Sequence, residues 1–535
     1  MSASIRPAGV IVFFALLLML PALVWGAPTV DSGAYNALWT GQFAEQMAHG
    51  DLYPRWLPRS FEGLGSPTFY FYPPLAYWLS GLGALVLDVR HAIAAAGFVL
   101  LLASGLAMYL WLARRQAAFP VLGACLYMLA PYHLGDFYAR SALAEFGAFV
   151  WLPLIALAID ASDRRWGPPV LAVSYAGLIC THLPTALLAS AILIPPLVLW
   201  RAWREPMAAV RCAAAGVAGL LLAGFYLAPA VLLQRYTLLE QLMWVPRFSP
   251  AHWSVFTLFR PGAEPALGVM VMLALKWAAV AIVALLVRRG RLFWSLMTLW
   301  ALACAIGLIP LTSLPGLDRV QFPWRALAIA EFAAVTAVAL APRALAPVIA
   351  AAAVCAQTLF PLADAAFAGV IAPADPALAQ RGVDAVEYLP ASLRPLPKTM
   401  SRPDLHAFDG PLVRGSVSAV TVGPRGSITL TATREGPVEI RRATFPRWRV
   451  TAHGKAVALA PGPLIRFEAR AGQTYRLEAV RTSAETLGLS LSLLGLLLTL
   501  ALPLRGWAPR RSGGGAVVQR SLRSPHLVAD APERH

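Results

Sequence analysis

The links between the apolar segments of this chain alternate in charge, and this alternation constrains the fold more than any other feature. Apolar residues make up 58% of the 535 positions, and stretches of about 20 apolar residues are long enough to cross a bilayer as helices. Every second link carries arginines, namely Arg114-Arg115, Arg164-Arg165, Arg201 with Arg204, Arg288-Arg289 with Arg291, and Arg343. Because positive charge marks the cytoplasmic ends of membrane helices, the intervening links are expected to face outward.

This pattern predicts a polytopic all-α membrane protein with about 12 transmembrane helices and both termini in the cytoplasm. The predicted spans lie near residues 8–26, 91–112, 118–133, 146–161, 168–182, 185–200, 209–233, 266–287, 292–311, 324–341, 345–361 and 484–503. The apolar segment 74–88 is excluded, because counting it as a span would place Arg114-Arg115 outside. We therefore expect an interfacial or re-entrant helix there, on the outer face.

The first apolar run, Val10 to Trp25, resembles a signal peptide. Cleavage after Ala27 would leave Pro28 next to the cut, which suits the peptidase poorly, so we expect an uncleaved first span. The segment 27–90 then forms a large first outer loop.

Two parts of this outer loop have a distinct composition. After Asp31, the residues Tyr35, Trp39, Phe43 and Met47 recur every four positions, which predicts an amphipathic helix on the membrane surface. The stretch 53–79 that follows is rich in proline, glycine and aromatic residues, so it cannot form one regular helix. An aromatic belt at the lipid headgroups is one interpretation of it.

The C-terminal part of the chain changes character after residue 361. Residues 362–483 are expected on the outer face, with a proline-rich loop at 376–410 and a small β-sandwich-like domain at 411–482, where apolar and polar residues alternate between turn signals. A final span at 484–503 leads to a disordered cytoplasmic tail, 504–535.

Several function classes are disfavoured by composition. The net charge of +17 does not indicate nucleic-acid binding, because the arginines lie at predicted helix ends and in the tail. The five cysteines fall in or beside apolar spans and form no CxxC pair. No P-loop, GxSxG, HExxH or suitably placed GxGxxG motif is present.

The candidate functional residues gather in the predicted outer links. Asp31 is either the N-cap of the amphipathic helix or a carboxylate that takes a proton from an acceptor hydroxyl. Asp136 and Arg140 are spaced as a helical surface ion pair, and Glu145 suits a helix N-terminus. The other interpretation is a phosphate-binding arginine held between carboxylates, since the planar guanidinium fork matches phosphate.

Further polar residues lie at other span ends or within spans. His182 is either structural or part of the site, and Arg325, beside Gln321, either extends to the interface or binds phosphate. Lys276 and Glu331 fall inside spans, and we interpret them as a buried pair with each other.

Asp31 after the first span is followed by an outer amphipathic helix, the sequence FYFYPPLAYWL and a span that ends in a basic pair. Together these features resemble the GT-C superfamily of integral-membrane glycosyltransferases. The chain also contains the motifs YPRW, GLGSPTFYFYPPL, DFYARSALAE, QFPWR and TFPRWRV. By these motifs it more closely resembles a bacterial branch named the 6-pyruvoyl-tetrahydropterin synthase-related membrane domain family, over most of residues 10–480. Residues 1–361 are by this resemblance a GT-C-like transmembrane domain, and nothing suggests pterin chemistry.

The resemblance implies transfer of a sugar from a polyprenyl-phosphate-linked donor to a glycan, lipid or protein acceptor at the periplasmic face of a bacterial inner membrane. It implies that Asp31 is the first-loop catalytic acid and that Glu145 serves in the second loop. Asp31 is followed by Ser32-Gly33 and not by a second acid, which favours a metal-independent site, although a divalent cation is not excluded. The substrate-binding candidates are Arg140, Asp136, Arg55, Tyr72, His182, Gln321 and Arg325.

Two other functions remain open at the level of sequence. A transporter or lipid flippase of envelope glycoconjugates would depend on polar groups near the membrane midplane, such as Lys276 and Glu331. A non-catalytic scaffold for envelope assembly would tolerate the loss of Asp31. The crowding of polar residues at the outer ends favours the enzyme.

Overall fold

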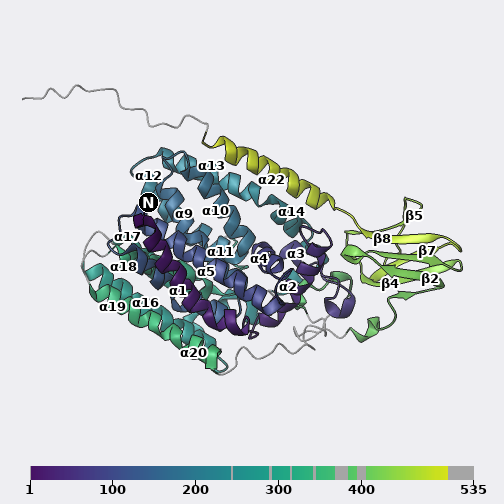
Figure 1. Cartoon of the computed structure of the whole chain (residues 1–535), viewed down its shortest axis with the longest axis horizontal. Coiled ribbons are helices and arrows are strands. Elements are labelled where there is room, and N and C mark those ends of the chain that lie inside the picture. Colours follow the sequence, from purple (N-terminus) through teal and green to yellow (C-terminus); the bar gives the residue numbers. More distant parts are fainter. Residues whose placement is uncertain are drawn as a thin grey trace, which may run out of the picture.

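The computed structural model describes residues 2–242, 245–287, 292–313, 316–340, 345–367, 384–393 and 405–503. Arg288, Arg289, Arg291, Arg343 and the tail 504–535 lie outside these residues, as does most of the proline-rich stretch 376–410. The described chain is mostly helical, with a small β domain near its C-terminal end (Figure 1).

Within the described residues, seven helical segments are long and apolar enough to cross a membrane, or eight if one bent pair counts as a span. The seven are α1 (Ser2–Trp25), α5 (Val89–Arg114), α8 (Leu143–Ala148) with α9 (Trp151–Asp160), α11 (Leu183–Leu188) through α12 (Ile194–Ala202), α16 (Pro265–Val287), α19 (Leu345–Cys355) through α20 (Leu359–Phe367), and α22 (Ser483–Ala501). The bent pair is α13 (Met207–Leu222) and α14 (Gly224–Leu232), which meet at 66°. By length and composition the chain is a membrane protein.

The other predicted spans are helical but too short or too broken to confirm twelve crossings. They are α6 (Pro120–Met128) with α7 (Pro131–Tyr138), α10 (Gly167–Thr181), α17 (Leu292–Ala305) and α18 (Leu327–Ala339). Every residue of α18 is buried inside the protein. A helix that is apolar all round can be the centre of a bundle as readily as a lipid-facing span, and the sequence does not separate the two.

The segment 74–88 does not have the length of a crossing helix. Its helical part, α4 (Leu75–Gly83), has nine residues and is therefore about 13 Å long, against about 30 Å of bilayer hydrocarbon. The next helix, α5, begins at Val89, where the Asp88 carboxylate accepts hydrogen bonds from the N–H groups of Arg90 and His91. This agrees with the prediction that the segment does not cross.

The predicted amphipathic helix is α2 (Gly33–Ala48), but its apolar stripe does not lie on a membrane surface. Trp39 and Phe43 are buried against the short helix α3 (Thr68–Phe71) and the residue after it, with ring centroids 4.8 Å apart for Trp39–Tyr72 and 4.9 Å for Phe43–Phe69. The aromatic residues of the first loop thus pack on this stripe and form part of a protein core. They do not form the belt at the lipid headgroups that was one interpretation of the sequence.

The C-terminal domain has two antiparallel sheets, with strand orders β1-β4-β7 and β2-β3-β8-β5-β6. Alternating residues of β3 and β5 are buried, as expected for strands with one face on a core. Phe467 of β7 and Tyr475 of β8 pack together at 4.9 Å and so join the sheets. The strands are β1 (Val413–Arg414), β2 (Val417–Val422), β3 (Ile428–Ala432), β4 (Gly436–Ala443), β5 (Trp448–Ala452), β6 (Lys455–Val457), β7 (Leu464–Ala469) and β8 (Thr474–Ala479).

The β domain packs on the first loop at one end of the helical bundle (Figure 1). The Ala443 N–H donates to the Leu64 carbonyl at 2.9 Å, and the Arg441 guanidinium donates to the Glu62 carbonyl at 2.7 Å. From this domain α22 runs back along the bundle. It packs closely on α14, because a Cβ added at Gly488 would lie only 2.7 Å from the Gly224 carbonyl oxygen.

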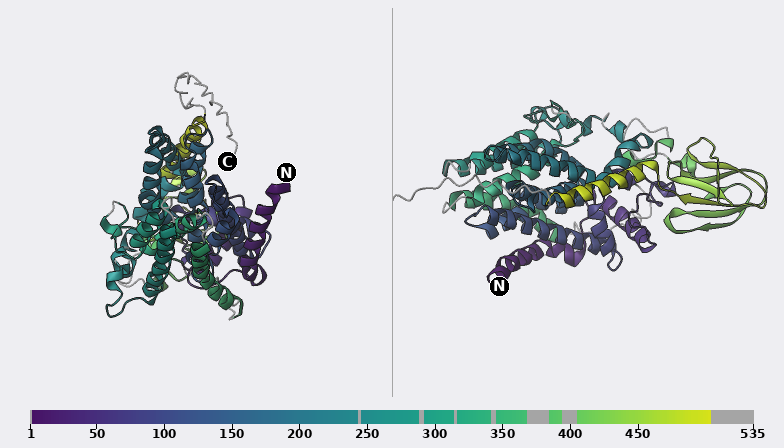
Figure 2. Two further views of the ribbon diagram at one scale, coloured as in Figure 1. Left: turned by 90° about the vertical axis from the view of Figure 1, so that its left-hand side faces the viewer. Right: turned by 90° about the horizontal axis from the view of Figure 1, so that it is seen from above.

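The arginine-bearing links that the structure describes gather at the opposite end. Arg114 and Arg115 both bind the Asp160 carboxylate, at 3.1 and 2.7 Å, and Arg201 binds Asp163 at 3.2 Å. The helices run lengthwise between this end and the β domain, as the right-hand view of Figure 2 shows. For the links that the structure describes, the alternation therefore predicted correctly that they share an end, while the side of the membrane that this end faces stays a prediction.

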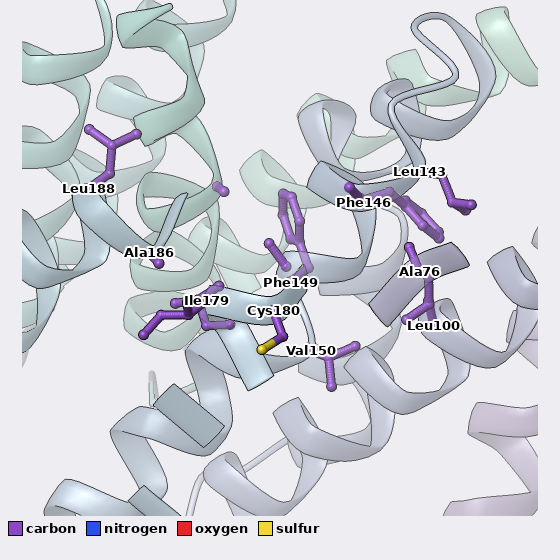
Figure 3. Packing of buried hydrophobic residues seen from close by; sticks show 14 of the residues in the cluster. Ala76, Leu100, Leu143, Phe146, Phe149, Val150, Ile179, Cys180, Ala186 and Leu188 are labelled. Carbon is purple, nitrogen blue, oxygen red and sulfur yellow. The ribbon is translucent and has the colours of Figure 1, made fainter. Parts of the chain in front are cut away.

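The core between these ends fixes the helix that carries Glu145. Leu143, Phe146 and Phe149, which flank Glu145 along the chain, pack among buried residues of neighbouring helices (Figure 3). The His133 ring stacks on Phe149 with centroids 3.9 Å apart, which ties α7 to the same core.

Candidate functional site

Glu145 is the centre of a buried cluster of charged and hydroxyl groups. One carboxylate oxygen, Oε2, accepts from Arg140 Nη1 at 3.1 Å and from Arg325 Nε at 3.3 Å. The other, Oε1, accepts from the Tyr132 hydroxyl. Only 2% of Glu145 is exposed, so these donors replace the water that would otherwise solvate its charge.

Arg140 connects both acids of the cluster. Its Nη1 also donates to Asp136 Oδ1 at 2.5 Å and to the Tyr132 hydroxyl at 3.1 Å. Asp136 is fully buried, so the interpretation of Asp136 and Arg140 as a surface ion pair is wrong. The Arg140 side chain retains 20% exposure, and the N–H groups that it does not use here have no acceptor among the described residues and are open to solvent.

The position of Tyr132 is set by Glu331. Glu331 accepts from the backbone N–H of Tyr132 at 2.8 Å and of His133 at 3.1 Å, which satisfies free donors at the start of α7. Trp277 Nε1 donates to the same carboxylate at 3.0 Å. The predicted pair of Lys276 with Glu331 is therefore wrong, and Lys276 Nζ instead donates to Gln357 at 2.7 Å.

The segment from Arg325 into α18 thus contacts the cluster twice. Arg325 lies in a short turn (Pro323–Ala326) directly before α18 and binds Glu145, while Glu331 lies within α18 and holds the start of α7. Of the two interpretations of Arg325, extension to the interface is not observed, because its side chain is 11% exposed and paired with Glu145.

Asp31 lies beside this cluster but does not cap α2. The N-cap position is Ser32, and no side-chain cap bond is made there. Asp31 is exposed and has a φ of 46°, a left-handed conformation that Asp tolerates better than most residues. The Ser32 N–H donates to the Arg140 carbonyl at 3.2 Å, and Asn36 Nδ2 donates to the Ser141 carbonyl at 2.5 Å. The backbone thus holds Asp31 next to the turn that carries Arg140.

Tyr72 and His182 border the cluster, whereas Gln321 makes no side-chain hydrogen bond among the described residues. Burial raises the pKa of Tyr72 to about 12, and the charges of Arg325 and Glu145 also act on it. His182 Nδ1 lies 2.8 Å from Thr185 Oγ1, and the buried ring interacts electrostatically with Glu145.

Arg55 is in a different place from the other candidates. Its Nε binds Glu485 Oε1 at 3.2 Å and its Nη2 donates to the Phe225 carbonyl at 2.8 Å. Glu485 lies in the first turn of α22 and also completes the capping box of that helix with Thr482. The structure therefore places Arg55 at the junction with the last helix and not in the Glu145 cluster.

Sequence reasoning missed Tyr132 and the segment 384–393. Asp384 accepts from Trp39 Nε1 at 2.7 Å and from Thr68 Oγ1 at 3.1 Å, which anchors this segment on the first loop. The neighbouring Glu387 interacts electrostatically with Tyr72 and Tyr35. An acidic residue in a proline-rich loop has no periodic signal, so only the fold could reveal that this segment packs on the first loop.

Among the described residues, no group of three or more His, Cys, Asp or Glu side chains is placed to hold a metal ion. What the cluster does offer is a pair of arginines that converge on one carboxylate at the end of the bundle. Guanidinium groups held in this way are suited to bind an oxyanion such as a phosphate.

No protein-family model matches the chain, and no curated protein matches it.

Proposed function

We propose that the protein is a GT-C-type glycosyltransferase that moves a sugar from a polyprenyl-phosphate-linked donor to an acceptor hydroxyl of a glycan, lipid or protein. The proposal places the reaction at the outer face of a bacterial inner membrane. Its main support is the convergence of Arg140 and Arg325 on the buried Glu145, together with the exposed Asp31, whose chain neighbour Ser32 is hydrogen-bonded to the Arg140 backbone.

In this proposal the acceptor oxygen attacks the anomeric carbon as the bond from that carbon to the phosphate oxygen breaks. Asp31 takes the acceptor proton, and the departing phosphate is held by the open N–H groups of Arg140 and Arg325. Glu145 has both oxygens engaged, so we assign it a positioning role and not that of the base. Asp136 and Tyr132 fix the orientation of Arg140.

The decisive experiment measures sugar transfer from a polyprenyl-phosphate-linked donor by purified variants. Asp31→Asn keeps the shape of the side chain, and loss of a general base lowers rates by roughly 10²–10⁴-fold. Asp88→Asn is the matched control, because it changes another exposed carboxylate of the first loop and retains helix-capping capacity.

Arg140→Lys tests the phosphate role separately. It retains the charge but loses the planar fork, so the KM for the donor should rise while the melting temperature stays close to that of the native protein. Native turnover in a folded Asp31→Asn protein would refute the catalytic assignment. Native donor binding in Arg140→Lys would refute the phosphate assignment.

A further inference from the structure

Two buried arginines at the base of the β domain have no anionic partner among the described residues. Arg442 and Arg447 are 4% and 6% exposed, and the Nε and Nη1 atoms of each are buried without a hydrogen-bond acceptor. Buried charges in proteins are normally paired, because the loss of hydration is otherwise uncompensated. Two unpaired guanidinium groups that influence each other electrostatically therefore indicate a missing acceptor.

The same place holds further unpartnered donors. Both guanidinium groups lie over the ring of Trp448, with Cζ atoms 5.3 Å from the ring centroid for Arg442 and 5.1 Å for Arg447. The buried indole N–H groups of Trp448 and Trp56 also lack acceptors, and these two rings are 5.2 Å apart. Unpartnered donors from the first loop and from the β domain thus lie around the Trp448 ring.

Two similar tetrapeptides build this place from opposite ends of the chain. They are Tyr-Pro-Arg-Trp at 53–56 and Phe-Pro-Arg-Trp at 445–448. Phe445 packs on Trp56 at 5.6 Å and on Tyr70 at 5.1 Å, so the two tetrapeptides meet directly. Arg55 also has a buried Nη1 without an acceptor, but its Nε is already bound to Glu485.

The arginines are held by regular structure. Arg442 lies in a register shift of β4, between Ile440 and Ala443, and such bulges redirect a side chain. The Arg447 carbonyl accepts from the Val480 N–H at 2.7 Å, just before α22 begins. Burial, together with the charge of Arg447, lowers the pKa of Arg442 to about 10. An anion bound between the two groups would remove this repulsion.

We propose that Arg442 and Arg447, with the indole N–H groups of Trp448 and Trp56, bind a phosphate-type oxyanion at the junction of the β domain and the first loop. Phosphate fits because it accepts from several N–H donors at once and because two guanidinium groups balance its charge. The site contains none of the residues of the Glu145 cluster, so the proposal does not depend on glycosyl transfer. A free phosphate and a lipid phosphate headgroup have this chemistry in common.

The test compares the melting temperature of the purified full-length protein with and without phosphate. Arg442→Met and Arg447→Met keep the aliphatic stem but remove the charge. In phosphate-free buffer each variant should melt at or above the native temperature, because a buried unpaired charge is lost. In saturating phosphate the order should reverse, with the Kd for phosphate raised roughly 10–100-fold in each variant.

Two arms distinguish the source of the phosphate, at constant ionic strength set with sodium chloride. One arm adds inorganic phosphate, and the other reconstitutes the protein in phosphatidylglycerol or phosphatidylcholine nanodiscs and identifies retained lipid by mass spectrometry. Arg449→Met, which removes an exposed arginine from the neighbouring strand, should respond like the native protein. If the native protein is stabilised in one arm and the Met variants are not, the site is supported, and that arm identifies whether the phosphate is free or part of a lipid.

Three results would overturn the site. The first is no stabilisation of the native protein in either arm. The second is equal stabilisation of native protein and variants, which would place binding elsewhere. The third is a lower melting temperature of the Met variants in every buffer, which would mean that the arginines serve only the fold. Trp56→Phe keeps the ring and removes one donor, so it repeats the test if a Met variant does not fold.

Discussion

At the scale of single residues, Glu145 is a buried acid on which two arginines converge. Two arginines and one tyrosine donate to a carboxylate that is 2% exposed. Sequence spacing could suggest the pair of Asp136 and Arg140, which are four positions apart. It could not suggest Tyr132 or the contact with Arg325, which is 180 positions from Glu145. Spacing reports neighbours on one helix, while contacts between helices depend on packing.

Glu145→Gln should destabilise the protein strongly. Removal of one partner from a buried ion pair leaves an uncompensated charge and typically costs about 3–5 kcal/mol. The control is Glu439→Gln, which breaks the more exposed pair with Arg414 and should cost less than about 1 kcal/mol. Melting temperatures in detergent measure both, and equal shifts would contradict the buried geometry.

Glu387 should make stability depend on pH. Burial and the nearby Asp384 raise the pKa of Glu387 to about 7 from a usual 4.5. An acid with a higher pKa in the folded state holds its proton more tightly when folded. Its contribution to stability is therefore complete below about pH 4.5 and is lost as the pH rises through about 7. The melting temperature of Glu387→Gln should decline less over this range than that of the native protein, and parallel curves would refute the shift.

At the scale of elements, the short helix α7 depends on a neighbouring helix for its position. It has eight residues, too few to be stable alone, and its first N–H groups depend on Glu331 from α18. From the sequence, Lys276 and Glu331 lie in spans and were expected to pair, because a buried charge needs a partner. The sequence could not show that Glu331 instead accepts from backbone N–H groups and that Lys276 donates to Gln357.

A double-mutant cycle separates the two arrangements. Glu331→Gln should cost about 1–3 kcal/mol, because a buried backbone donor loses its acceptor. Lys276→Met should be independent of it, so the coupling energy of the two changes should be below about 0.5 kcal/mol. A coupling of several kcal/mol in thermal or denaturant unfolding would restore the Lys276–Glu331 pair.

The helix α2 illustrates the limit of periodicity. The repeat of Tyr35, Trp39, Phe43 and Met47 correctly predicted a helix with one apolar face. Periodicity does not identify what covers that face, and the cover is the aromatic segment around Phe69 and Tyr72 and not lipid. The predicted range of the β domain, 411–482, contains all eight strands that the structure describes. This prediction succeeded because the alternation of apolar and polar residues directly indicates a strand with one buried face.

At the scale of the whole molecule, the basic links within the described residues lie at the end of the bundle opposite the β domain (Figure 1). The arginine alternation predicted that these links share an end, because charge at helix ends is a property of the sequence alone. The number of crossings was not predictable in the same way. The central helix α18 is as apolar as a lipid-facing span, and only its packing shows that protein surrounds it.

Cysteine labelling with a membrane-impermeant reagent should show that the two ends of the bundle lie on opposite sides of the membrane. In a protein with Cys125, the one partly exposed native cysteine, replaced by alanine, Leu87→Cys and Val422→Cys should be labelled from the same side. Trp203 is 92% exposed in a basic link, and Trp203→Cys should be labelled only from the other side. Labelling of all three from one side would contradict the topology.

The docking of the β domain on the first loop has a consequence for how the chain is made. Glu62 and Arg441, which meet in the finished protein, are 379 residues apart in sequence. A ribosome that adds about 5–20 residues per second needs roughly 20–80 seconds to traverse that distance. Throughout that interval the surface of Trp56 and Tyr70 has no cover from the β domain. Newly made chains therefore pass through a period in which an aromatic surface is open to chaperones, to neighbouring chains and to aggregation.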